Sequence, residues 1–191
     1  QYNYNVILYD ISKEALDKAM LVINKNLGRM VVKNVISEEI KNITLKNIIT
    51  TTDFNMIKKS DLIIEAVSEN LDLKKSIFKK LDLECGKDTI LASNTSSISI
   101  TELAESTNRK DKVIGMHFMN PVPIMSLVEI INSKHTSTTT TETIIEISEK
   151  LGKIPLTVND YPGFISNRIL MPMINEAIEA LEDGVSTVKN I

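Results

Sequence analysis

The segment GMHFMNPVPIMSLVEII, residues 115–131, contains two apolar runs typical of β-strands, separated by the loop Asn120-Pro121-Val122-Pro123. Because proline lacks an amide hydrogen and fixes its own φ, the two prolines forbid a helix here, and the chain must turn. The two extended runs can therefore bring His117 against Glu129. A histidine paired with a carboxylate is the usual way to build a general base, because the carboxylate fixes the ring tautomer and stabilises the imidazolium. The alternative is a buried histidine that happens to precede a loop.

The composition is that of an ordinary globular protein. The chain has 191 residues, 42% of them hydrophobic and 25% charged, and a net charge of −3. This length allows one domain, or one domain with part of another. The net charge gives no support for binding to nucleic acid or to a membrane surface, and no apolar run approaches the about 18 residues that cross a bilayer. Cys85 is the only cysteine, so the sequence predicts no disulfide and no cysteine-based metal site. A reduced, cytoplasmic compartment is therefore expected.

Around the central segment, short apolar runs alternate with helical patterns, which predicts an α/β fold. Strands are expected at residues 6–9, 48–52, 62–67, 89–92, 113–118, 127–131 and 154–158. Helices are expected from Ser12 to about residue 30, from Ser37, at 73–83, 100–104 and 141–151, and from Pro162 to about residue 183. Continuous apolar strands between amphipathic helices indicate a mostly parallel sheet with helices on both faces.

Polar residues follow several predicted strands at their carboxyl ends, where such sheets bind ligands. They are Asp10 and the clusters at residues 68–70, 93–97 and 117–120. In a dinucleotide fold, an acid at the position of Asp10 bonds the adenosine ribose and repels the 2′-phosphate of NADP. The alternative is an ordinary aspartate at a helix start.

The six glycines form no G-x-G-x-x-G phosphate-binding motif. If the chain has a dinucleotide fold, its first strand and glycine-rich loop are therefore expected to lie outside the residues given.

Four segments, IIEAVSENLDLKK, ILASNTSSISI, GMHFMNPVPIMSLVEII and NDYPGFISNRIL, carry a family resemblance through their order and spacing. They resemble the 3-hydroxyacyl-CoA dehydrogenase family, and within it the bacterial 3-hydroxybutyryl-CoA dehydrogenases. The resemblance implies a Rossmann-type NAD-binding domain at residues 1–159, incomplete at its N-terminus. It also implies that residues 160–191 begin a helical domain, most of it absent, through which the intact protein forms homodimers.

The resemblance implies oxidation of the 3-hydroxyl of an acyl-CoA thioester to a ketone with NAD, or the reverse reaction. His117 matches the catalytic histidine of the family, and Glu129 matches its carboxylate partner. Ser96 matches the serine that bonds the substrate oxygen, and Asn167 matches the asparagine that completes the site. Serine and asparagine can donate to the developing charge on oxygen.

The resemblance also implies the residues that bind the cofactor and CoA. Asp10 matches the ribose-binding acid, and the positions lining the nicotinamide half are Glu69, Lys74, Asn94 and Asn120. The alternative for Lys74 is a solvated lysine, because it stands beside Lys75 on a helix face. Asn26 and Lys33 match positions that approach CoA; they are seven residues (33 − 26), or two helical turns, apart and so share a face. Asn26 departs from the serine seen in some relatives.

Two other functions remain open. One is a non-catalytic protein on the same fold, such as the related lens crystallin, and the other is the dehydrogenase part of a multifunctional fatty-acid oxidation protein. The presence of His117, Glu129 and Asn167 favours an enzyme. The chain as given, without its phosphate-binding loop, is expected to be inactive by itself.

Overall fold

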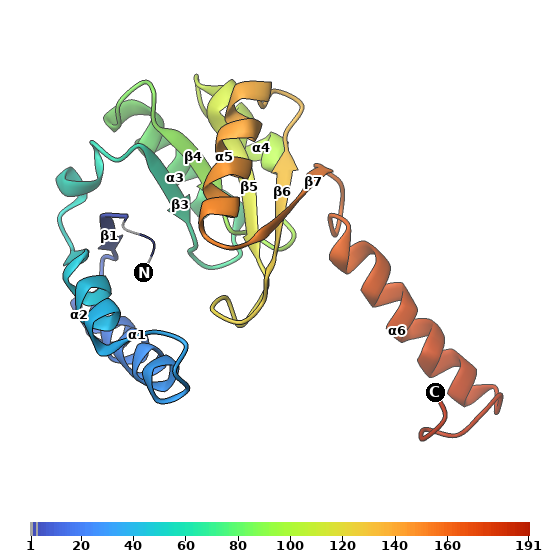
Figure 1. The fold of residues 1–191 in the computed structure, drawn as a ribbon. Coiled ribbons are helices and arrows are strands. Elements are labelled where there is room, and N and C mark those ends of the chain that lie inside the picture. Colours follow the sequence, from blue (N-terminus) through green and yellow to red (C-terminus); the bar gives the residue numbers. More distant parts are fainter. Residues whose placement is uncertain (1, 3) are drawn as a thin grey trace. The chain divides into compact units, whose positions relative to one another are not determined.

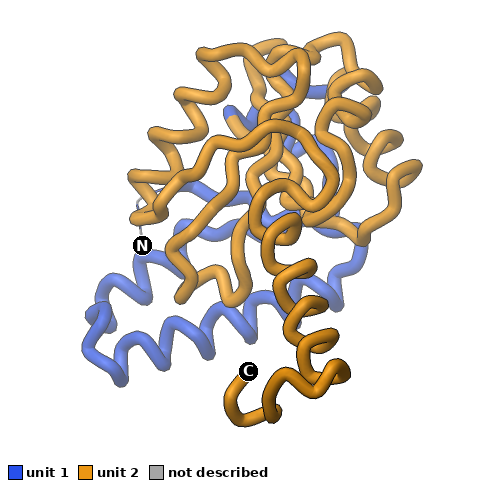
Figure 2. The backbone as a smooth tube through the Cα atoms, turned by 90° about the vertical axis from the view of Figure 1, so that its right-hand side faces the viewer, with its two compact units in different colours: residues 1–61, 84–86 blue, residues 62–83, 87–191 orange. Residues whose placement is uncertain are grey.

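A computed structural model describes residues 2 and 4–191, which form two compact units (Figure 2). The first unit is formed from residues 1–61 and 84–86, and the second from residues 62–83 and 87–191.

The first unit is a small parallel sheet with two helices. Its elements are β1 (Val6–Tyr9), α1 (Lys13–Val32), α2 (Glu38–Lys46), β2 (Ile48–Thr51) and the 3-10 turn η1 (Phe54–Ile57). β1 pairs in parallel with β2, so that Val6 lies opposite Ile48. The hydroxyls of Ser12 and Ser37 accept the amides of Ala15 and Ile40, which caps the two helices where the sequence predicts that they begin.

A five-stranded sheet is the framework of the second unit (Figure 1). In spatial order its strands are β3 (Leu62–Glu65), β4 (Ile90–Ser93), β5 (Val113–Phe118), β6 (Leu127–Asn132) and β7 (Ile154–Asn159). The helices of this part of the chain are α3 (Leu71–Glu84), α4 (Ile100–Glu105), α5 (Thr138–Lys150) and α6 (Ser166–Glu182), with a 3-10 turn, η2 (Lys110–Lys112). All neighbouring strands are parallel except β5 and β6, which flank the proline loop and run antiparallel. The predicted mostly parallel sheet is confirmed.

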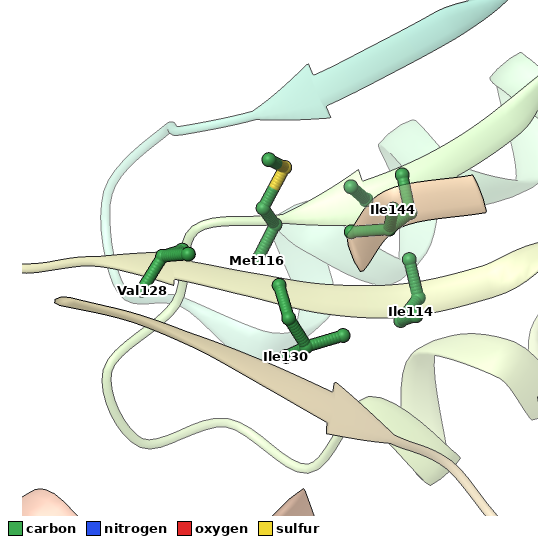
Figure 3. Packing of buried hydrophobic residues seen from close by; sticks show 6 residues of the cluster. Ile114, Met116, Val128, Ile130 and Ile144 are labelled. Carbon is green, nitrogen blue, oxygen red and sulfur yellow. The ribbon is translucent and has the colours of Figure 1, made fainter. Parts of the chain in front are cut away.

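One face of this sheet is buried under α5. Because side chains alternate along a strand, Ile114 and Met116 of β5 share a face with Val128 and Ile130 of β6. These four side chains pack with Ile144 of α5, and all five are fully buried (Figure 3). Burial of side chains of this size contributes about 1.5–3 kcal/mol each, and a slip of one residue would expose them, so the register of β5 and β6 is strongly specified.

The opposite face of the same strands carries α4 and the candidate site. Gly115 and His117 of β5 belong to this face, as do their register partners on β6, Ile131 and Glu129. A Cβ atom on Gly115 would lie 2.8 Å from Ile131 Cβ and 3.0 Å from Ile100 Cγ1 of α4. The close approach of α4 therefore depends on glycine at this position, and helices cover both faces of the sheet, as predicted.

The last helix begins later than the sequence predicts. A helix is expected from Pro162, but α6 begins at Ser166. Gly163 and Phe164 have φ values of 80° and 48°, and residues of this hand cannot belong to a right-handed helix. No residue of α6 is buried in the described chain. Among the residues that the structure describes, no helix is both long enough and apolar enough to span a membrane.

Candidate active site

His117 and Glu129 face each other across the antiparallel strands β5 and β6. They are direct register partners, and His117 Nδ1 lies 2.7 Å from Glu129 Oε2. Both side chains are buried, with 7% of His117 and none of Glu129 exposed. The proline loop reverses the chain and the buried core fixes the register, so these two features together position the pair.

The second carboxylate oxygen of Glu129 accepts two backbone amides at the start of α6. Glu129 Oε1 lies 3.1 Å from the Ile165 nitrogen and 2.8 Å from the Ser166 nitrogen. Burial raises the pKa of the Glu129 carboxyl, but the hydrogen bonds from His117, Ser166 and Ile165 outweigh it and hold the pKa below its usual value. Glu129 is therefore a carboxylate at neutral pH although it is buried.

An ionised Glu129 sets the tautomer of His117. A carboxylate can only accept, so the hydrogen in the 2.7 Å contact belongs to His117 Nδ1. In the neutral ring, Nε2 is then an acceptor, which is the form that a general base requires. When the ring takes a proton, the adjacent carboxylate stabilises the imidazolium.

Ser96 and Asn167 lie close to each other although they are far apart in sequence. Asn167 Nδ2, in the first turn of α6, donates to the Ser96 carbonyl oxygen at 3.4 Å. The Ser96 amide donates to Glu69 Oε1 at 2.7 Å. Because Asn167 directly follows Ser166, whose amide binds Glu129, the start of α6 connects the Ser96 loop with the His117–Glu129 pair.

Lys74 is buried, so its interpretation as a solvated lysine is wrong. Only 1% of Lys74 is exposed, and its Nζ donates to Glu65 Oε1 at 2.7 Å and to the Val67 carbonyl at 3.1 Å. Glu69 Oε2 lies 3.7 Å from the same nitrogen. Glu65, which the sequence reasoning did not single out, also accepts the Ser93 hydroxyl at 2.7 Å. A charged residue inside an apolar strand is the signal that could have pointed to Glu65.

Glu69, Asn94 and Asn120 follow three adjacent strands at their carboxyl ends. Asn94 Oδ1 accepts the Phe118 amide at 2.9 Å, whereas Asn120 is exposed in the proline loop. Glu69 binds the Thr95 hydroxyl at 2.8 and 2.9 Å. Because β3, β4 and β5 are parallel, these three ends lie at one edge of the sheet, and the polar residues gather there.

Asp160 is a second residue that the sequence reasoning did not single out, although it belongs to the segment NDYPGFISNRIL. Its Oδ2 accepts the Ser99 hydroxyl at 2.6 Å and the Thr101 amide at 2.8 Å. Burial raises the pKa of Asp160, but the hydrogen bonds from Ser99 and Thr101 hold it below the usual value. Asp160 therefore joins the end of β7 to the start of α4.

The first unit carries Asp10, Asn26 and Lys33. Asp10 Oδ1 accepts the Ser12 amide at 2.8 Å, a contact typical of a helix start. Asn26 is half-buried on α1, and Lys33 is the exposed C-cap of that helix. The helix ends at Val32, one residue before Lys33, whereas the predicted spacing places both residues on the helix. Lys33 shares a pocket with several charged side chains, among them Lys25, Arg29, Glu38 and Lys41.

Two family models match this chain and together cover nearly all of it. The model described as 3-hydroxyacyl-CoA dehydrogenase, NAD binding domain, matches residues 1–161. The chain belongs to the 3-hydroxyacyl-CoA dehydrogenase family. The C-terminal domain of the same family matches residues 163–191.

Individual members of the 3-hydroxyacyl-CoA dehydrogenase family agree with this assignment. The 3-hydroxybutyryl-CoA dehydrogenase of Clostridioides difficile is 47% identical over 98% of this chain and 67% of its own length. The mitochondrial hydroxyacyl-coenzyme A dehydrogenase of Homo sapiens is 41% identical over 98% of this chain and 62% of its own length. The crystal structure of (S)-3-hydroxybutyryl-CoA dehydrogenase from Ralstonia eutropha is 45% identical, with a TM-score of 0.96 over all of this chain and 67% of that one. The chain thus spans about two thirds of the length of these relatives.

The family assignment confirms NAD as the cofactor, because the NAD-binding domain of the 3-hydroxyacyl-CoA dehydrogenases matches residues 1–161. Among the described residues, no group of three or more His, Cys, Asp or Glu side chains is placed to hold a metal ion.

Proposed function

We propose that the protein containing this chain interconverts (S)-3-hydroxyacyl-CoA and 3-ketoacyl-CoA with NAD, and that 3-hydroxybutyryl-CoA is its substrate. The observation that carries the proposal is the buried His117–Glu129 pair, in which the second ring nitrogen is an acceptor. Relatives named 3-hydroxybutyryl-CoA dehydrogenase support the choice of substrate.

NAD, when bound, supplies the acceptor for the hydride that leaves C3 of the substrate. In oxidation, His117 Nε2 takes the proton of the 3-hydroxyl, and in reduction the imidazolium returns it. Glu129 stabilises that imidazolium through its contact with Nδ1. Ser96 and Asn167 donate hydrogen bonds to the substrate oxygen as charge develops on it.

The polar residues at the strand ends fit a dinucleotide. Glu69, Asn94 and Asn120 offer donors and acceptors at one edge of the sheet, the edge where such folds bind NAD. Lys74 contributes by holding Glu65 and Glu69 in place from within the protein. Asp10 binds the ribose hydroxyls and disfavours the 2′-phosphate of NADP.

The charged side chains around Lys33 support its contact with the CoA part of the substrate, because CoA carries phosphates. They include three further cations, Lys25, Arg29 and Lys41, and one acid, Glu38, which pairs with Lys41. This surplus of positive charge supports a phosphate-binding role for Lys33.

The exposed apolar stripe on α6 supports a helical domain through which two subunits pair. Its exposed members include Leu170, Met173, Ile174, Ile178 and Leu181. We assign residues 160–191 to a helical domain that pairs two subunits in a homodimer, after an NAD-binding domain at residues 1–159. Exposed apolar area of this kind is typical of an interface. A cytoplasmic location, consistent with the single cysteine, belongs to the same proposal.

The experiment is the replacement His117→Ala in the whole protein that contains this chain. We expect kcat for acetoacetyl-CoA reduction by NADH to fall by about 10²–10⁴-fold with a modest change in KM, because the proton donor is lost. His135→Ala is the matched control, since His135 is the only other histidine and lies in an exposed loop. A near-normal kcat in the His117 variant would refute the role of His117. A folded wild-type protein without any turnover would favour a non-catalytic member of the fold.

The alternative of a multifunctional protein predicts the same effect of His117→Ala on this reaction. A second enzymatic activity encoded in the same reading frame would distinguish it from a separate dehydrogenase.

A further inference from the structure

Phe164 has a backbone conformation that aromatic residues rarely adopt. Its φ is 48°, and 4% of the residue is exposed. Among the described residues, the other non-glycine residue with positive φ is Asn34, and asparagine tolerates this region. A bulky residue there is strained, and such strain persists only where surrounding contacts enforce it. The contacts that Phe164 makes therefore indicate why the strain is retained.

The ring of Phe164 packs against the ring of His117. The two ring centroids are 5.9 Å apart, and the ring planes are tilted by 58°. This distance lies in the range of favourable aromatic pairs. Because Glu129 binds Nδ1 and Phe164 contacts the ring, two separate contacts hold His117 in place.

The backbone of Phe164 directs two amides at Glu129. Phe164 is left-handed, whereas Ile165, with φ −104° and ψ −42°, is right-handed. Successive residues of opposite hand turn their amide hydrogens to one side and form a concave anion-binding site, a nest. Here the Ile165 and Ser166 amides lie 3.1 and 2.8 Å from Glu129 Oε1. A right-handed Phe164 would turn these amides away from the carboxylate.

We propose that Phe164 is a positioning residue for the His117–Glu129 pair: its ring holds the histidine, and its left-handed backbone aims the two amides that bind the carboxylate. The inference rests on the proposed function only for its effect on turnover. Among the described residues, the titratable group that contacts Glu129 is His117, and the register partner of Glu129 on β7 is the apolar Leu156.

Two variants separate this role from simple packing. Phe164→Gly and Phe164→Val both remove the ring, but glycine adopts positive φ without strain and β-branched valine does not. We expect the Glu129 carboxyl to titrate near its wild-type midpoint in the glycine variant, and about one pH unit higher in the valine variant. Simple packing predicts the reverse order, because glycine deletes more buried volume.

The titration is followed by ¹³C NMR of the Glu129 carboxyl, assigned with Glu129→Gln, in the whole protein without substrate. Hydrogen exchange at the Ile165 and Ser166 amides should become faster in the valine variant and not in the glycine variant. Equal behaviour of the two variants, or a larger shift in the glycine variant, overturns the inference. If Phe164→Val does not fold, Phe164→Ala replaces it, since alanine also disfavours positive φ.

Turnover gives a second readout. In an active protein, kcat should fall more in the valine variant than in the glycine variant, because only the glycine variant keeps both amides on Glu129. If the wild-type protein shows no turnover, the proposed function fails, while carboxyl titration and amide exchange still decide whether Phe164 positions the pair.

Discussion

The His117–Glu129 pair of the second unit is held by residues from distant parts of the chain, whereas the side chain of Asp10 in the first unit is held by a near neighbour in sequence. Glu129 contacts His117 on the adjacent strand and the amides of Ile165 and Ser166 at the start of α6. Asp10 accepts the amide of Ser12 through Oδ1, and its Oδ2 has no hydrogen bond within the described residues.

Substitutions at the two sites should therefore affect stability differently. Replacing a residue of the second-unit site removes contacts that also hold the sheet, so stability and chemistry should change together. Replacing Asp10 removes one local contact, so the choice of ligand should change while stability hardly does. The four predictions that follow test this contrast.

The largest effect is expected from Lys74→Met. Lys74 and Glu65 form a buried pair, and removing one partner leaves an uncompensated buried charge. The free energy of unfolding should fall by about 3–5 kcal/mol, measured by urea denaturation. Lys75→Met is the matched control, because Lys75 pairs with Glu102 at the surface and should contribute at most about 1 kcal/mol. Equal losses of unfolding free energy in the two variants would show that the buried pair is no more important for stability than the surface pair.

Glu129→Gln should destabilise the protein by about 1.5–3 kcal/mol at neutral pH, because charge-assisted hydrogen bonds are lost. The folded-state pKa of Glu129 lies below the ordinary value that the carboxyl has in the unfolded chain. Glu129 therefore contributes its stability above that unfolded value, and the contribution is lost as the pH falls through the lower folded-state pKa.

The difference in the free energy of unfolding between wild type and Glu129→Gln should accordingly become smaller at acidic pH. Urea denaturation at a series of pH values between about 7 and 3 measures it. Glu149→Gln, an exposed replacement on α5, should show no such trend. A difference that does not narrow once the pH falls below the ordinary pKa of a glutamate would contradict an ionised, hydrogen-bonded Glu129.

The sequence predicted the sheet well because its strands are continuous apolar runs between helical patterns. The pairing of His117 with Glu129 was also predictable, since two prolines force a turn between two strands of matching length. The start of α6 was not, because the left-handed conformation of Phe164 depends on contacts with residues far along the chain. Local sequence gives no sign of such strain.

Burial of single charges was the other feature that local pattern missed. Lys74 stands beside Lys75 on one helix, yet only Lys74 reaches a buried carboxylate. Glu65 and Asp160 bind residues 28 and 61 positions away, Ser93 and Ser99, so their partners follow from the tertiary fold and not from spacing. The family resemblance places Lys74 beside the nicotinamide, and that role stays a prediction.

A smaller effect is expected from Ser99→Ala. The Ser99 hydroxyl donates to Asp160 and accepts the Glu102 amide at the start of α4. Its loss should lower the free energy of unfolding by about 1 kcal/mol. Ser76→Ala is the control, because its hydroxyl makes one exposed bond to the Leu73 carbonyl, and a change within about 0.5 kcal/mol is expected. A loss no larger than the control would mean that Asp160 does not hold α4 through Ser99.

The smallest effect on stability is expected from Asp10→Ser, which keeps a short polar side chain beside the Ser12 amide. The free energy of unfolding should change by no more than about 0.5 kcal/mol, because the contact is local and Asp10 is only half-buried. The ratio of kcat/KM for NAD to that for NADP should fall in the whole protein, since the carboxylate no longer repels the 2′-phosphate. Asp17→Ser, on the exposed surface of α1, removes the same charge from the same unit and should leave that ratio unchanged. If Asp10→Ser destabilised the protein as much as Glu129→Gln, the contrast between the two units would be wrong. If the ratio did not move, Asp10 would be an ordinary aspartate at a helix start, and the preference for NAD would have to come from other residues.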